Sequence, residues 1–136
     1  AQYRMGEHAA ALATFESVLA VQPESAGAQL WAGLSAYALK DYPSAVQYIE
    51  RAVQLEPASA EARVNLGAAY LAAERYQDAE LVYQMLVEEV PGNAEAHYNL
   101  GWSLYAQNRQ DAARDAWVQA SDLGFGPAQD ALQRYF

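Results

Sequence analysis

The chain has 136 residues, enough for one domain, and 53% of them are apolar. Its formal net charge of −9 leaves no basic stripe to neutralise phosphates, so the composition argues against a nucleic-acid partner and against an anionic membrane surface. The absence of cysteine excludes a disulfide framework, a thiol nucleophile and a thiolate metal site, and no apolar run approaches the length of a membrane span.

Proline, glycine and alanine recur along the chain at a fixed interval of 34 residues. A period of this size is typical of a helical solenoid, in which each repeat buries its apolar face only against its neighbours. The recurring residues are Pro23, Pro57 and Pro91; Gly33, Gly67 and Gly101; and Ala11, Ala45, Ala79 and Ala113.

Residues 1–25 are predicted to be a truncated first repeat. Aligned on Pro23, Ala1 corresponds to the tenth position of the repeat, so we expect a remnant of a first helix, a turn at Gly6 and a second helix over about 9–22. Phe15 and Val18 then lie where they should pack against the missing helix. This edge is either the boundary of a trimmed segment or an apolar surface that another chain covers.

Residues 26–59 form the second repeat, with helices predicted over about 26–39 and 43–56. Pro43 suits the first turn of the second helix, where its missing N–H costs nothing, and Asp41 is placed to cap that helix. Residues 60–93 form the third repeat, with helices near 60–73 and 77–90. Gly92 and Asn93 then offer the permissive backbone that a tight connection needs.

Residues 94–126 form the fourth repeat, with helices near 94–107 and 111–123. Asn108 is expected to end the first helix in a left-handed conformation, and Asp111 to begin the second. The period then fails, because the sequence GFGP replaces the expected proline. We predict a capping helix over 127–136 that covers the fourth repeat, and one domain over 1–136. The covering residues are predicted to be Ala131, Leu132 and Tyr135.

These repeats resemble the tetratricopeptide repeat family, and the last segment resembles the related Sel1-type repeat. The resemblance implies an all-α, right-handed α-solenoid of helix-turn-helix repeats that serves as a binding scaffold for protein partners. The third repeat carries the pattern through Leu66, Gly67, Tyr70, Ala79, Tyr83 and Pro91. The fourth repeat carries it through Leu100, Gly101, Ala113, Trp117 and Ala120.

No residue pattern indicates catalysis, a metal or a cofactor. His8 and His97 each lack a second histidine three or four positions away, so both are interpreted as packing residues. Glu88 and Glu89 are adjacent and point in different directions on a helix, which suits a solvated face better than acid–base chemistry. We therefore expect a non-enzymatic protein without a cofactor.

The resemblance also predicts a binding groove, because in this family the first helix of each repeat lines the concave surface. The predicted surface is aromatic at both ends and nearly uncharged, and two asparagine amides in its middle suit an extended peptide backbone. The groove residues are predicted to be Tyr3, Arg4, Leu30, Trp31, Leu34, Tyr37, Val64, Asn65, Ala68, Leu71, Tyr98, Asn99, Trp102 and Tyr105.

Two functions follow from this pattern. The leading hypothesis is a protein-interaction scaffold whose groove takes an apolar or aromatic peptide or helix, with basic flanks favoured by the acidic exterior. Glu61 and Glu95 stand where family members that grip chaperone carboxylates need a cation, so that ligand is disfavoured. The alternative is a structural role, in which copies of the chain form a homo-oligomer through the repeat edge or the groove.

Overall fold

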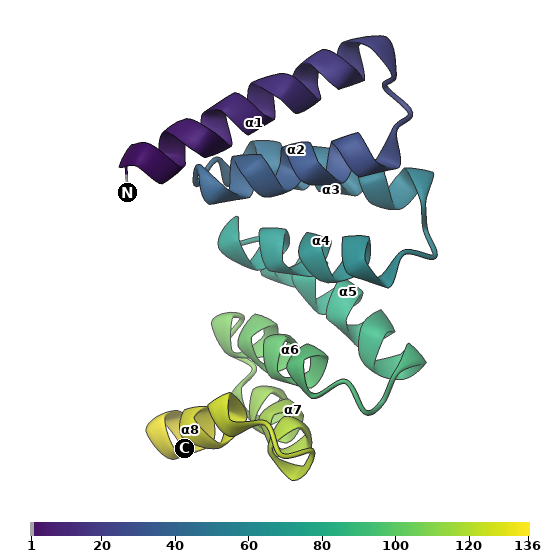
Figure 1. Ribbon diagram of the computed structural model, residues 1–136. Coiled ribbons are helices and arrows are strands. Elements are labelled where there is room, and N and C mark those ends of the chain that lie inside the picture. The colour runs from purple at the N-terminus through teal and green to yellow at the C-terminus, as the bar shows by residue number, and fades with distance from the viewer. Residues whose placement is uncertain (1) are drawn as a thin grey trace. The chain divides into compact units, whose positions relative to one another are not determined.

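The computed structural model describes the backbone of residues 2–136 and the side chains of residues 4–136. The described part is helical and contains no strand, which confirms the predicted all-α class (Figure 1). Its eight helices are α1 (Gln2–Val21), α2 (Ala26–Ala38), α3 (Tyr42–Leu55), α4 (Ala60–Ala72), α5 (Tyr76–Glu89), α6 (Ala94–Ala106), α7 (Gln110–Asp122) and α8 (Gly126–Tyr135).

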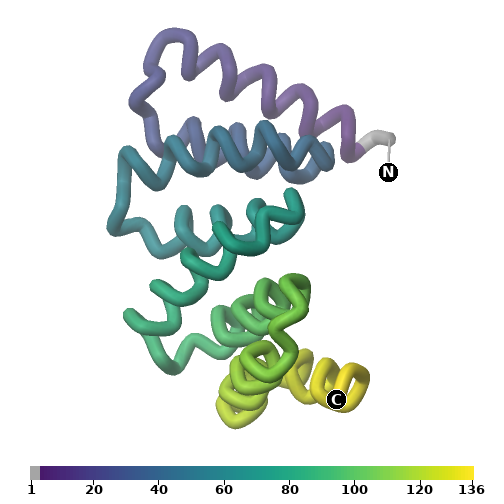
Figure 2. The backbone as a smooth tube through the Cα atoms, turned by 180° about the vertical axis from the view of Figure 1, so that it is seen from behind, coloured from purple at the N-terminus to yellow at the C-terminus, as the bar shows by residue number. Residues whose placement is uncertain are grey.

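The chain forms two compact units, which are described in turn. Unit 1 comprises residues 1–73 and holds α1 to α4, the purple-to-teal half of Figure 2. Unit 2 comprises residues 74–136 and holds α5 to α8, the green-to-yellow half. The predicted single domain stays a prediction.

The expected turn at Gly6 was wrong, because α1 is one continuous helix through that residue. A glycine ends a helix when it adopts a left-handed conformation, and among the described glycines only Gly124 does so. Continuing the helix through Gly6 also keeps the backbone N–H groups of this segment hydrogen-bonded. Gly6 therefore extends the second helix of the first repeat rather than ending a remnant of the first.

Unit 1 is a stack of antiparallel helices in which α2 packs between α1 and α3, and α3 packs on α4. Gly33 permits the close approach of α2 and α3, since a Cβ atom at this position would overlap the buried side chain of Ile49. On the next helix, the Tyr70 hydroxyl donates a 2.6 Å hydrogen bond to a carboxylate oxygen of Glu50. These contacts tie three successive helices together.

Unit 2 repeats this design with larger side chains. A Cβ atom at Gly101 would overlap the indole of Trp117, which is fully buried between α6 and α7. The Trp117 indole Nε1–H donates a 3.0 Å hydrogen bond to the carbonyl oxygen of Tyr98. On the neighbouring helix α5, the Glu80 carboxylate accepts from Arg109 Nη1 at 2.8 Å and from Gln107 Nε2 at 2.9 Å.

The turns inside the repeats share one backbone conformation. Lys40, Glu74 and Asn108 lie 34 residues apart and are left-handed, with φ of 63°, 61° and 62°. This confirms the prediction for Asn108. The connection from α7 to α8 has the same form: Gly124 has a φ of 88°, and Phe125 N–H donates to the Ala120 carbonyl at 3.0 Å. A connection of this type in place of the proline segment explains why the sequence period fails there.

The helices that open each repeat share one cap. The side chains of Ser25, Ser59 and Asn93 accept backbone N–H bonds at 3.1–3.2 Å from the residue three positions on. Asn93 is thus an N-cap with a φ of −79°, not the permissive turn residue that was expected. Asp41 caps α3 as predicted, by accepting from Ser44 N–H at 3.3 Å.

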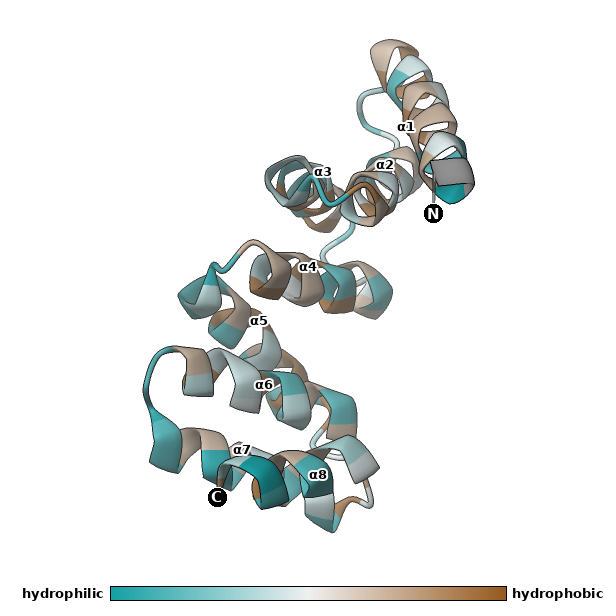
Figure 3. Cartoon of the chain, turned by 90° about the vertical axis from the view of Figure 1, so that its left-hand side faces the viewer, coloured by the Kyte–Doolittle hydropathy of each residue, from teal (hydrophilic) through white to brown (hydrophobic). Residues whose placement is uncertain are grey.

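Apart from α1, which begins seven residues before its predicted start, the observed helices lie within about one residue of their predicted limits, with one further correction. α7 begins at Gln110 with Arg109 as its N-cap, so Asp111 lies inside the first turn rather than starting the helix. There its carboxylate still complements the positive end of the helix dipole. Hydrophilic and hydrophobic residues are interspersed along the helices (Figure 3). No helix among the described residues is long and apolar enough to cross a bilayer.

Candidate functional site

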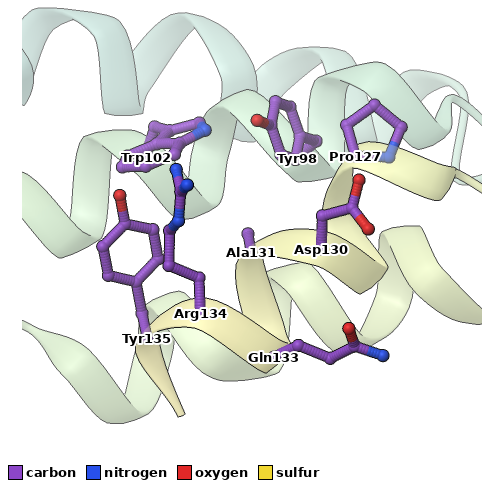
Figure 4. A pocket seen from close by; sticks show the side chains of 8 residues that line it. All are labelled: Tyr98, Trp102, Pro127, Asp130, Ala131, Gln133, Arg134 and Tyr135. Carbon is purple, nitrogen blue, oxygen red and sulfur yellow. The ribbon is translucent and has the colours of Figure 1, made fainter.

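A pocket of unit 2 lies between α6 and α8. It has a volume of about 550 Å³ and is open to solvent, and aromatic rings form one of its walls (Figure 4). Two of its residues, Tyr98 and Trp102, belong to the predicted groove. The lining residues are Tyr98, Trp102, Pro127, Asp130, Ala131, Gln133, Arg134 and Tyr135.

Trp102 joins this pocket to the core of unit 2. Its ring centroid lies 5.0 Å from that of the buried Trp117, 5.5 Å from that of Tyr135 and 6.1 Å from that of Tyr98. The indole is half-buried, so it supports folding as well as offering a surface. The resemblance to the family assigned Trp102 to the groove, and the repeat pattern assigned Trp117 to the core, but neither indicated that the two rings touch.

Asp130 and Arg134 bring opposite charges to the pocket. They lie four residues apart on α8, and Figure 4 shows both side chains reaching from α8 toward α6. They are the only charged residues among those that line the pocket. The prediction did not include either one, because α8 was assigned a capping role and stands outside the 34-residue period.

α8 makes the contacts expected of a cap. Ala128 and Ala131 are buried, and the Tyr135 ring lies 5.1 Å from Tyr105 and 5.9 Å from Trp117 between centroids. The remaining predicted capping residue, Leu132, is half-buried. The same helix therefore both covers the fourth repeat and supplies the second wall of the pocket.

Among the groove residues whose side chains the structure describes, unit 1 presents the most exposed aromatic residue. Trp31 on α2 is 53% exposed, and one face of its ring stacks on Phe15 of α1 with 6.5 Å between centroids. Trp31 also lines a smaller pocket of about 200 Å³, together with Leu30, Glu56, Glu61 and small residues. Tyr37 is 38% exposed at the other end of α2, edge-on to Tyr42.

The other predicted groove residues differ in how far solvent reaches them. Leu30 is buried at 8% exposure, which places its side chain in the core of unit 1. Arg4 is exposed on α1, and the side chain of Tyr3 lies outside the described residues. The half-buried members are Leu34, Val64, Asn65, Ala68, Leu71, Asn99 and Tyr105.

Among the described residues, no three His, Cys, Asp or Glu side chains are arranged to hold a metal ion. His97 Nε2 lies 2.8 Å from the carbonyl oxygen of Pro91, a local contact that ties α6 to the preceding connection. Burial raises the pKa of Tyr48 above its ordinary 10.0, and the carboxylates of Glu16 and Asp41 raise it further.

Antiparallel helices repeated every 34 residues, with aromatic side chains on their opening helices, define a helical-repeat scaffold. The family model for the tetratricopeptide repeat matches residues 1–60, 41–94 and 87–131. The chain belongs to the tetratricopeptide repeat family. The family, whose members are typically non-catalytic scaffolds, supports a role in protein interaction. The Sel1-like end stays a prediction.

Solved structures of MamA share this fold. The structure of MamA residues 41 to the end from Desulfovibrio magneticus RS-1 is 25% identical, with a TM-score of 0.80 over 89% of this chain and 68% of that chain. A crystal structure of MamA protein is 23% identical, with a TM-score of 0.84 over 96% and 73% of the two chains. No curated protein matches the chain. These similarities support the α-solenoid class.

Proposed function

We propose that the chain is a non-catalytic scaffold that binds an apolar or aromatic segment of a protein partner on the opening helices of its repeats. The observation that carries this proposal is the pocket of about 550 Å³ in unit 2, whose aromatic wall includes Tyr98 and Trp102. Pockets of this size lined by rings and a few polar groups are typical binding sites for side chains of a partner.

Unit 1 supports the same proposal independently. The indole of Trp31 is half exposed, although burial of such a ring is strongly favourable. The half-buried amide of Asn65 in unit 1 makes no side-chain hydrogen bond within the described part of the chain, so it remains able to pair with a peptide backbone, and the same holds for Asn99 in unit 2. The acidic exterior accelerates association with partners that have basic flanks.

An array of peptides tests the proposal, with the full chain as the probe and sequences that vary in aromatic and aliphatic content. We expect retention of peptides with apolar anchors. Tyr98→Ala should weaken their binding by about thirtyfold, the ratio that corresponds to about 2 kcal/mol at a hot spot. Leu81→Ala is the matched control, because Leu81 is 65% exposed on α5 of the same unit and does not line the pocket. Unchanged binding by a folded Tyr98→Ala variant would contradict the proposal.

One observation favours the alternative of self-assembly. α1 exposes two apolar side chains about one turn apart on the same side of the helix, Val18 at 39% and Val21 at 80% exposure. A second copy that covers this face would form a homo-oligomer. Sedimentation over a range of protein concentrations tests this alternative. Assembly through α1 predicts that the mass of the full chain rises with concentration, and that the Val18→Glu variant keeps the mass of a monomer. A monomer at all concentrations contradicts it.

A further inference from the structure

The pocket between α6 and α8 is framed by two pairs of residues, each pair spaced by one helical turn. Tyr98 and Trp102 lie four residues apart on α6, and Asp130 and Arg134 lie four residues apart on α8. In Figure 4, Asp130 stands at the end of the pocket marked by Tyr98 and Pro127, and the Arg134 guanidinium reaches toward Trp102 at the other end. The pocket therefore has a negative end and a positive end, each beside an aromatic ring.

The two charges are not used by the fold. An Asp and an Arg four residues apart on a helix often pair with each other. Here neither side chain makes an ion pair or a hydrogen bond within the described part of the chain. Both are exposed residues on the wall of the pocket. Their charges are thus available to a ligand.

The spacing of these charges matches an extended peptide. Four residues of an α-helix rise about 6 Å. Two residues of an extended chain advance about 6.5 Å and place both side chains on the same side. A helical ligand is about 10–12 Å wide and fits less well between two helices. Aliphatic stems of long charged side chains also pack well on aromatic rings, and a cation gains from the face of a tyrosine.

We infer that this pocket binds an extended peptide whose basic and acidic side chains are two positions apart, the basic one paired with Asp130 and the acidic one with Arg134. The inference rests on the proposed function, because it assigns the ligand of the same pocket. Its chemical content is new, since it makes α8 the element that selects the partner and makes a pair of opposite charges at a fixed spacing the property that is selected.

The test uses an array of nine-residue peptides with a constant apolar background. Two positions of each peptide carry every combination of Lys, Glu and Gln. The second of these positions is either the second or the fourth residue after the first. With the full chain as the probe, peptides that pair Lys with Glu at a spacing of two should bind about fivefold better than Lys–Lys or Glu–Glu peptides. That ratio corresponds to one partly exposed ion pair of about 1 kcal/mol. Stronger binding at a spacing of four would indicate a helical ligand and overturn the inference.

Arg134→Glu provides the decisive variant. It should replace the preference for Glu at one peptide position with a preference for Lys, while the preference for Lys at the other position persists. Arg114→Glu is the matched control, because Arg114 is exposed on α7, lies outside the pocket and undergoes the same change in charge. Peptides that bind without charge preference, or a Glu preference that survives in Arg134→Glu, overturn this inference and leave the proposed function standing. Failure to retain any peptide overturns both.

Discussion

In unit 2, Gly101 controls the position of the large side chain of Trp117. Gly101 faces Trp117 so closely that any side chain would overlap the indole, and Trp117 is fully buried and hydrogen-bonded to Tyr98. The ring has no free volume into which to move, because interiors are close-packed. The recurring glycine of the sequence pattern is therefore a packing residue, and here the structure gives the physical reason for the pattern.

We predict that Gly101→Ala lowers the free energy of unfolding by about 1–3 kcal/mol, the usual cost of overpacking a core. Chemical denaturation followed by circular dichroism measures this change. Gly27→Ala is the control, since Gly27 lies in α2 and a methyl group there would have no neighbouring atom within 4 Å. It should stabilise by about 0.4–1 kcal/mol, because alanine restricts the unfolded chain. Equal effects of the two substitutions would contradict the packing role of Gly101.

The environment of Tyr48 predicts that the free energy of unfolding changes with pH in the alkaline range. Burial, followed by the Glu16 carboxylate, raises its pKa in the folded chain above the ordinary 10.0. The unfolded chain then releases this proton at a lower pH than the folded chain. The contribution of Tyr48 to the free energy of unfolding is fully present below pH 10, and it is lost as the pH rises through the pKa of Tyr48 in the folded chain.

The measurement compares the full chain with Tyr48→Phe by chemical denaturation at pH 8 and pH 11. Phenylalanine cannot ionise, so the variant should lose less free energy of unfolding between the two pH values than the full chain does. The other tyrosines are common to both proteins and cancel in the comparison. A pH dependence that is the same in both proteins would show that the environment of Tyr48 does not disfavour its ionised form.

At the scale of helices, the sequence predicted the helices whose residues recur from one repeat to the next. It missed features that do not recur. The helices of repeats two to four were found to within about one residue because prolines, caps and apolar residues all repeat there. The turn at Gly6 was wrongly placed because the period marks where a turn falls in the repeat but not whether the glycine there adopts a left-handed conformation. The pocket charges on α8 were missed because that helix has no counterpart from which its inward positions could be read.

Docking of α8 depends on small residues on its buried side. Ala131 is only 5% exposed, so Ala131→Asp would bury an unpaired carboxylate, at a cost of several kcal/mol unless the helix leaves its place. We predict that α8 undocks, and that amide hydrogen exchange in residues 126–135 becomes at least about tenfold faster, the ratio that 1.4 kcal/mol gives. Gln129→Asp is the control, because Gln129 is exposed on the same helix. Slow exchange in Ala131→Asp would contradict the capping role.

At the scale of the whole molecule, the period predicted the class of fold, and the comparisons with known proteins confirmed it. The exposure of individual groove residues was less predictable. Leu30 and Trp31 are neighbours that were both assigned to the groove, yet one is buried and the other is half exposed. Periodicity assigns a residue to a face of its helix, but the size and tilt of neighbouring helices decide how much solvent reaches it.

The left-handed turn between α2 and α3 has a practical consequence for chemistry on this protein. Its central residue, Lys40, is exposed and is the only lysine in the sequence. Amine-directed reagents therefore meet a single side-chain target, which lies in unit 1, whereas the pocket of α6 and α8 lies in unit 2. A dye or a surface linker attached at Lys40 leaves every residue of that pocket chemically intact, so the chain can be immobilised through one defined side chain.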